Sequence, residues 1–198
     1  MIIFRNLFLV VFFVFILSGC STFLRPAEAD IFLEKNNRFV FPPPDSLGYK
    51  VSATQLFHGQ YGRHQFDIQV VVEADNNELR MVGLAPWGGQ LYSIKLSKGK
   101  IEYKELDNSR MRINPEYTVT DFILTYWPIS VLNNWISKKG LRVTETGSNP
   151  VTRTILDEDR PVITINYKNK DKWKGKISFK NIKQDYSFQI ETVRVDIQ

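Results

Sequence analysis

Cysteine and histidine are scarce in this sequence, and their scarcity excludes several kinds of site. The 198 residues contain one cysteine, Cys20, so an internal disulfide is impossible. The two histidines, His58 and His64, have neither a cysteine nor paired acids beside them at metal-ligand spacing, which argues against a zinc site. No serine stands in a nucleophile elbow, and residues 59–62 (GQYG) lack the lysine and hydroxyl residue of a phosphate loop. We therefore expect a protein that is not an enzyme and needs no cofactor.

An excess of charge of one sign is also lacking. The formal net charge is only +5, with no dense arginine cluster, which does not support a nucleic-acid partner. The length is enough for one domain with a sizeable core and too short for two ordinary ones.

Long apolar runs are confined to the N-terminus. Residues 7–17 form an apolar run, too short to cross a hydrocarbon core that needs ~20 residues. This run follows Arg5 and precedes Leu17-Ser18-Gly19-Cys20, so residues 1–19 are typical of a signal peptide. The four-residue motif resembles the bacterial lipobox. That resemblance implies cleavage after Gly19, attachment of acyl chains such as palmitate at Cys20 and, with Ser21 next in the chain, an outer-membrane lipoprotein that faces the periplasm.

A proline-rich segment separates the lipidation site from the rest of the chain. Three consecutive prolines at positions 42–44 favour an extended backbone with few hydrogen bonds. We therefore interpret residues 20–47 as a lipidated N-terminal tether, and residues 48–198 as the folded domain.

Alternating apolar residues predict a mainly β domain. Phe66, Ile68 and Val70 fall on one face of a strand that ends at residues 75–77 (DNN), which tolerate the positive φ of a tight hairpin. Further strands are expected at residues 78–85, 90–97, 100–106, 141–146, 153–157, 162–168, 174–180 and 186–197. In the last of these the parity of the apolar positions changes, which predicts a bulge near Glu191 and Thr192.

Two short apolar helices interrupt the strands. Asn114 is a candidate N-cap, followed by Pro115 at the first helical position. Pro128 ends this helix and opens a second, which Gly140 closes. A strongly curved antiparallel sheet needs something on its concave face, and the helices are candidates for a lid or plug.

The chain resembles the LolB and LolA group of periplasmic lipoprotein receptors and carriers. The resemblance lies in residues 59–62, the alternating strand after them, residues 82–91 (VGLAPWGGQL) and the helix pair before Leu141. Residues 42–48, continuing into 51–56, resemble an uncharacterised family of short lipoproteins within that group. The implied fold is a LolB-like unclosed antiparallel β-barrel with a short helical lid or plug and an apolar cavity that shields acyl chains.

The resemblance and the spacing of apolar residues together predict the site. The expected lining of the cavity is Phe66, Ile68, Val70, Tyr92 and Ile94 from the strands, with Phe122, Ile123, Leu132 and Ile136 from the helices. Trp87 lies in a short turn with Pro86 and two glycines, so we expect an exposed ring. In LolB-like receptors the matching loop contacts the membrane, although with an aliphatic residue in place of tryptophan.

Two functions of different class remain open. The first is an outer-membrane lipoprotein that binds an acylated ligand (a lipid, glycolipid or lipoprotein) and aids its transfer to the outer membrane, with a LolA-like carrier or an export machine as partner. The alternative is a structural or assembly lipoprotein that docks an export machine without binding lipid. Lysines at alternate positions from Lys168 to Lys176 either contact lipid phosphates or form a solvated hairpin.

Overall fold

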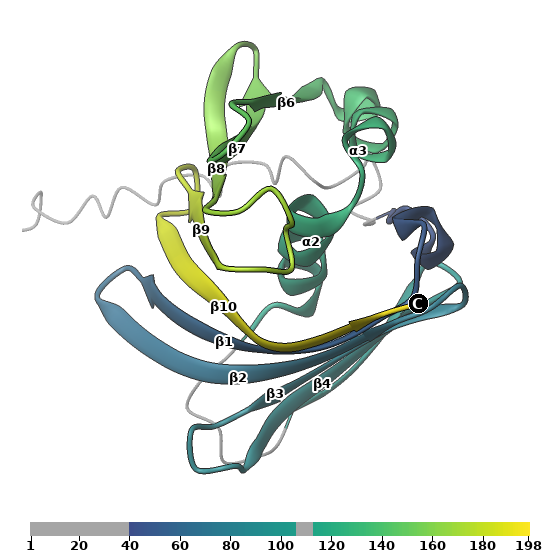
Figure 1. Cartoon of the computed structure of the whole chain (residues 1–198), viewed down its shortest axis with the longest axis vertical. Helices are drawn as coiled ribbons and strands as arrows, with labels where there is room; N and C mark the ends of the chain where they lie inside the picture. The colour runs from purple at the N-terminus through teal and green to yellow at the C-terminus, as the bar shows by residue number, and fades with distance from the viewer. Residues whose placement is uncertain (1–39, 106–112) are drawn as a thin grey trace, which may run out of the picture. The chain divides into compact units, whose positions relative to one another are not determined.

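The computed structural model describes residues 40–105 and 113–198, and strands make up most of them (Figure 1). The strands are β1 (Val51–Tyr61), β2 (His64–Ala74), β3 (Glu78–Leu84), β4 (Gln90–Ser97), β5 (Lys100–Glu105), β6 (Leu141–Thr146), β7 (Val151–Asp157), β8 (Arg160–Tyr167), β9 (Lys176–Asn181) and β10 (Tyr186–Ile197). The helices are α2 (Pro115–Tyr126) and α3 (Ile129–Ile136), with short 3₁₀ helices η1 (Pro44–Leu47) and η2 (Ser137–Lys139).

All ten strands belong to one antiparallel sheet. Its order is β5-β4-β3-β2-β1-β10-β9-β8-β7-β6, so each half of the chain forms a meander and the pairing of β1 with β10 joins the halves. The edge strands β5 and β6 do not pair with each other, so the sheet is not closed. The expected fold class, mainly β with an unclosed antiparallel sheet and short helices, is confirmed.

The alternation of side chains decides which face of the sheet is buried. In β2, Ile68, Val70 and Val72 are buried, whereas Gln65 and Asp67 on the other face are exposed. The sheet curves around α2, which lies on its concave side (Figure 1). The two-residue period therefore directs one face of each strand toward this helix.

The predicted bulge in the last strand is present. Thr192 pairs with Gln55 and Arg194 pairs with Thr54, which leaves Val193 as the extra residue. The bulge moves the inward-facing positions by one residue, as the change of parity in the sequence requires.

Local signals place both helices. The Asn114 side chain caps α2 by accepting a hydrogen bond from the Tyr117 N–H at 3.1 Å, and Pro115 occupies the first turn. Pro128 separates α2 from α3, and Gly140 ends the following 3₁₀ turn with a φ of 77°. Both predicted helices are confirmed. Within residues 40–105 and 113–198, no helix is long and apolar enough to cross a membrane.

Of the tether expected for residues 20–47, residues 20–39 lie outside the described residues, as does the expected signal peptide, and residues 41–47 pack on the domain. Phe41 and Leu47 are buried, and the Trp127 indole N–H donates a hydrogen bond to Ser46 Oγ at 2.9 Å. The apolar residues that flank the prolines are the physical reason, because they gain more from burial than from an exposed extended backbone.

Two turns also differ from the prediction. The β2–β3 turn has no residue with positive φ, because the Asp75 carboxylate accepts hydrogen bonds from the N–H groups of Asn77 and Glu78 at 2.7 and 2.9 Å. Strand β9 begins at Lys176 rather than Lys174, because the Asp171 carboxylate fixes a turn that places the Trp173 ring in the core.

Candidate ligand-binding site

A cavity of about 800 Å³ lies between α2 and the sheet. Its volume falls within the range of ~300–1,000 Å³ that is usual for small-molecule sites. Most of its lining is apolar or aromatic. The lining residues are Phe57, Tyr61, His64, Gln65, Phe66, Ile68, Met81, Tyr92, Ile113, Asn114, Tyr117, Thr118, Asp121, Phe122, Thr125, Gln184, Tyr186, Phe188 and Ile190.

Two glycines let aromatic rings lie across the strands beside the cavity. Gly59 pairs with Phe66, and a Cβ atom at Gly59 would stand 2.2 Å from Phe66 Cζ. Gly83 pairs with Tyr92 in the same way, and its Cβ would stand 2.1 Å from Tyr92 Cε1. Each ring therefore occupies the place that a neighbouring side chain would fill. Any side chain at these glycines would have to displace a ring that lines the cavity.

A buried carboxyl group is the main polar feature of the cavity. Asp121 of α2 is 9% exposed, and its Oδ2 accepts a hydrogen bond from the Tyr186 hydroxyl at 2.7 Å. Burial raises the pKa of Asp121 to about 8, and the bond from Tyr186 offsets part of that effect. Burial, together with the nearby carboxyl group, holds the pKa of Tyr186 well above its usual range. Both groups are therefore mainly neutral at pH 7.

A buried arginine fixes the C-terminal end of α2. The Arg153 guanidinium donates to the backbone oxygens of Leu124, Thr125 and Trp127, at 3.3 Å for Thr125 and 2.9 Å for Trp127. It also pairs with Glu145 at 2.6 Å. A cation at the C-terminus of a helix meets carbonyl groups that lack helical donors and the negative end of the helix dipole. Arg153 therefore holds α2 over the sheet.

The structure brings together four of the nine predicted lining residues. Phe66, Ile68, Tyr92 and Phe122 line the cavity. The other five are buried and lie outside its lining, namely Val70, Ile94, Ile123, Leu132 and Ile136. Spacing correctly assigned these five to the buried face, but the cavity occupies only one end of that face. Because these five residues do not line the cavity, their positions do not support contact with a ligand.

Tyr117, Asp121 and Tyr186 are lining residues that the sequence prediction missed. An aspartate between apolar residues of a predicted helix is a signal that could have found Asp121, since acids are seldom buried without a partner. No comparable signal marks Tyr186, because it lies on β10 and meets Asp121 from 65 positions away.

Trp87 is exposed, as predicted. The turn between β3 and β4 is closed by a hydrogen bond from the Gly88 N–H to the Ala85 oxygen at 2.8 Å, and Trp87 is 83% exposed. Because neighbouring strands are antiparallel, this turn lies at the same end of the sheet as the β1–β2 hairpin, whose Tyr61 and His64 line the cavity. Whether Trp87 contacts a membrane remains a prediction.

The lysine-rich segment does not form one charged face. Lys168, Lys170, Lys174 and Lys176 are exposed, whereas the Lys172 ammonium donates to Glu145 at 2.9 Å and lies 5.2 Å from the centre of the Tyr167 ring. Burial lowers the pKa of Lys172, and the bond to Glu145 offsets part of that effect. This arrangement fits the solvated hairpin better than a phosphate-binding surface.

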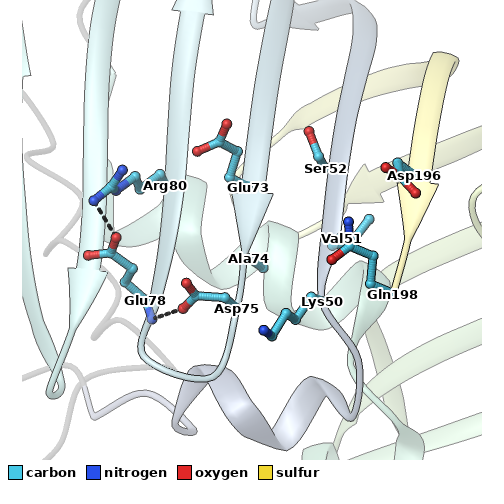
Figure 2. A pocket seen from close by; sticks show the side chains of 10 residues that line it. All are labelled: Lys50, Val51, Ser52, Glu73, Ala74, Asp75, Glu78, Arg80, Asp196 and Gln198. Carbon is cyan, nitrogen blue, oxygen red and sulfur yellow. Dashed lines mark hydrogen bonds and ion pairs between the residues drawn. The ribbon is translucent and has the colours of Figure 1, made fainter.

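A smaller hollow of about 200 Å³ lies at the opposite end of the sheet, and Figure 2 shows its lining of mostly charged and polar side chains. Several are already satisfied within the hollow. Arg80 pairs with Glu78, and Asp75 binds the Glu78 N–H. Elsewhere, His58 pairs with Asp67 on the exposed face. Among the described residues no cluster of histidine, cysteine, aspartate and glutamate could hold a metal ion, and Cys20 lies outside them.

Comparisons with known proteins give a family but no function. No curated protein matches the chain. A solved structure of a domain from Vibrio parahaemolyticus, provisionally named an outer membrane lipoprotein-sorting protein domain, is 8% identical, with a TM-score of 0.31 over 75% of this chain and 85% of that one. At that identity and TM-score the likeness carries no argument. A family model described as "Protein of unknown function (DUF3261)" matches residues 52–194, and the chain therefore belongs to the DUF3261 family.

Proposed function

We propose that this protein is an outer-membrane lipoprotein that binds an acylated ligand and aids its transfer to, or placement in, the outer membrane. The observation that carries the proposal is the cavity of about 800 Å³ with a mostly apolar lining. A cavity of this kind is suited to remove a hydrocarbon chain from water without any cofactor.

Hydrocarbon burial supplies enough free energy for such binding. Each methylene taken out of water contributes ~0.8 kcal/mol, so about ten methylenes contribute ~8 kcal/mol before the cost of immobilising the chain is subtracted. The Phe66 ring in the lining offers contact area without polar groups that would lose water, and the ring of Tyr92 adds aromatic surface.

The position of Trp87 supports a role in delivery. Its exposed indole lies at the end of the sheet where Tyr61 and His64 line the cavity. An indole suits a membrane interface, because its body is apolar while its N–H can stay hydrated. A lipid anchor at Cys20 would keep the domain near the membrane.

The cavity also supports a role in binding rather than catalysis. Its described lining contains no serine, cysteine or lysine that could act as a nucleophile. The two lining threonines donate their hydroxyl protons to backbone oxygens four residues earlier, Thr118 to Asn114 and Thr125 to Asp121. A LolA-like carrier or an export machine would be the protein partner.

Native mass spectrometry of the full-length protein after gentle extraction tests the proposal. Wild-type protein should carry an adduct with the mass of an acylated lipid. Gly83→Ala should reduce it, because the added Cβ displaces the Tyr92 ring toward the cavity. Ser93→Thr is the matched control, since it adds one carbon on the other face of β4. A wild-type protein with no adduct, and no binding of a fluorescent fatty acid, would favour the assembly lipoprotein instead.

A further inference from the structure

The hydrogen bonds around Asp121 have a fixed direction. The Gln184 N–H donates to Asn181 Oδ1 at 3.0 Å, which leaves the Asn181 amide nitrogen to donate to the Tyr186 oxygen at 3.2 Å. Tyr186 has a single hydroxyl proton and directs it to Asp121 Oδ2 at 2.7 Å. Asp121 Oδ2 is therefore an acceptor.

The second oxygen of this carboxyl group has no partner. Asp121 Oδ1 is buried and makes no hydrogen bond to any described residue. Neither lysine nor arginine is present in the described lining, so no lysine or arginine is available there to stabilise a carboxylate. With Oδ2 accepting from Tyr186, the proton of the neutral carboxyl group resides on Oδ1.

A buried donor without an acceptor needs one from a ligand. An unsatisfied polar group in an apolar site is costly, and a ligand that offers an acceptor at this point removes that cost. A hydrocarbon chain alone cannot do so, whereas an acyl chain has a carbonyl oxygen at its head. A cationic head group would need an ionised carboxylate and would lose its water in an apolar cavity.

We infer that Asp121 is a specificity-determining residue, and that its Oδ1 donates a hydrogen bond to the carbonyl oxygen at the head of an acyl chain held in the cavity. Tyr186 and Asn181 are positioning residues that orient the carboxyl group. The inference rests on the proposed function and deepens it. The carbonyl group can belong to a free fatty acid or to the ester or amide of an acylated lipid, and both offer the same acceptor.

Competition between matched probes tests this inference on the full-length protein transferred from detergent to amphipol. Methyl dodecanoate, dodecanoic acid and a linear alkane of equal length each displace a bound apolar fluorophore, N-phenyl-1-naphthylamine. One neutral hydrogen bond should make the wild-type protein prefer the ester to the alkane by about 3- to 10-fold. Preference for the ester indicates an acylated lipid as the source, and preference for the acid alone indicates a free fatty acid.

Two variants separate the hydrogen bond from the packing. Asp121→Asn keeps an acceptor for Tyr186 and a donor for the carbonyl group, so it should retain the preference for the ester. Asp121→Leu is close in shape and has no donor, so it should bind ester and alkane equally. With a ¹³C-labelled ester carbonyl, the infrared C=O stretch should lie at lower frequency in the wild-type protein and Asp121→Asn than in Asp121→Leu.

The outcomes distinguish failure of the Asp121 hydrogen bond from failure of lipid binding. If the wild-type protein binds ester, acid and alkane equally, or if Asp121→Leu keeps the preference for the ester, the role of Asp121 is refuted and lipid binding stands. If none of the three probes displaces the fluorophore from the wild-type protein, the proposed function itself fails, and the inference fails with it.

Discussion

The buried guanidinium of Arg153 should dominate the stability of the helical part of the domain. Arg153→Met removes the donor from the backbone oxygens of Leu124 and Trp127 at the end of α2, whereas the Thr125 oxygen keeps a hydrogen bond from the Tyr167 hydroxyl at 2.7 Å. Each buried acceptor left without a donor costs ~1–3 kcal/mol, and breaking a buried charged network typically costs ~3–5 kcal/mol in total. Glu145 adds little to this loss, because it is partly exposed and keeps its bond to Lys172.

Unfolding of the full-length protein by guanidinium chloride in mild detergent, monitored by tryptophan fluorescence, measures the change in the free energy of unfolding. The expected result is a loss of ~3–5 kcal/mol in the free energy of unfolding, and in a thermal melt the same loss lowers the melting temperature by roughly 6–20 °C for a domain of this size. Arg142→Met is the matched control, because Arg142 pairs with Asp159 on the surface and such exposed pairs contribute ~0–1 kcal/mol. If both variants lost the same small amount, the claim that Arg153 holds α2 in place would be refuted.

Three further predictions follow from the structure and the sequence. Asp121 has a folded-state pKa of about 8 against an ordinary pKa of 3.8, so the folded state holds the proton more tightly and the free energy of unfolding falls as pH rises from 4 to 8. The free energy of unfolding of Asp121→Asn should therefore exceed that of the wild-type protein by roughly 2–5 kcal/mol at pH 8 and by little at pH 4. Chemical unfolding at both pH values measures this difference, and a difference that is independent of pH would contradict the prediction. Because the side chain is exposed, Trp87→Glu should change the free energy of unfolding by less than about 0.5 kcal/mol and leave ligand binding normal. The same variant should slow delivery of a fluorescent acyl ligand to vesicles, and an unchanged delivery rate would remove Trp87 from the mechanism. Cys20→Ala should leave a soluble or uncleaved product in membrane fractionation, and a correctly processed variant that still floats with the outer membrane would refute lipidation at this residue.

Local patterns in the sequence are enough to place most elements of the fold. The alternation in Phe66, Ile68 and Val70 identifies a strand and its buried face, because side-chain direction in a strand repeats every two residues. Asn114 and Pro128 mark the boundaries of the helices through capping and the missing proline N–H, which act within one turn of the chain. The exposure of Trp87 follows from the tight turn that Pro86 and Gly88 impose.

Contacts between distant parts of the chain decided the site. The pairing of β1 with β10 brings Tyr186 to Asp121. The periodicity of apolar residues within either segment cannot predict this contact. The sequence by itself determined which residues face inward, but only the tertiary structure decided which of them line a cavity and which fill the core. The physical reason is that a cavity remains only where side chains from several elements together leave space unfilled. The Phe66 ring, for example, lies across Gly59 and leaves room between the sheet and α2.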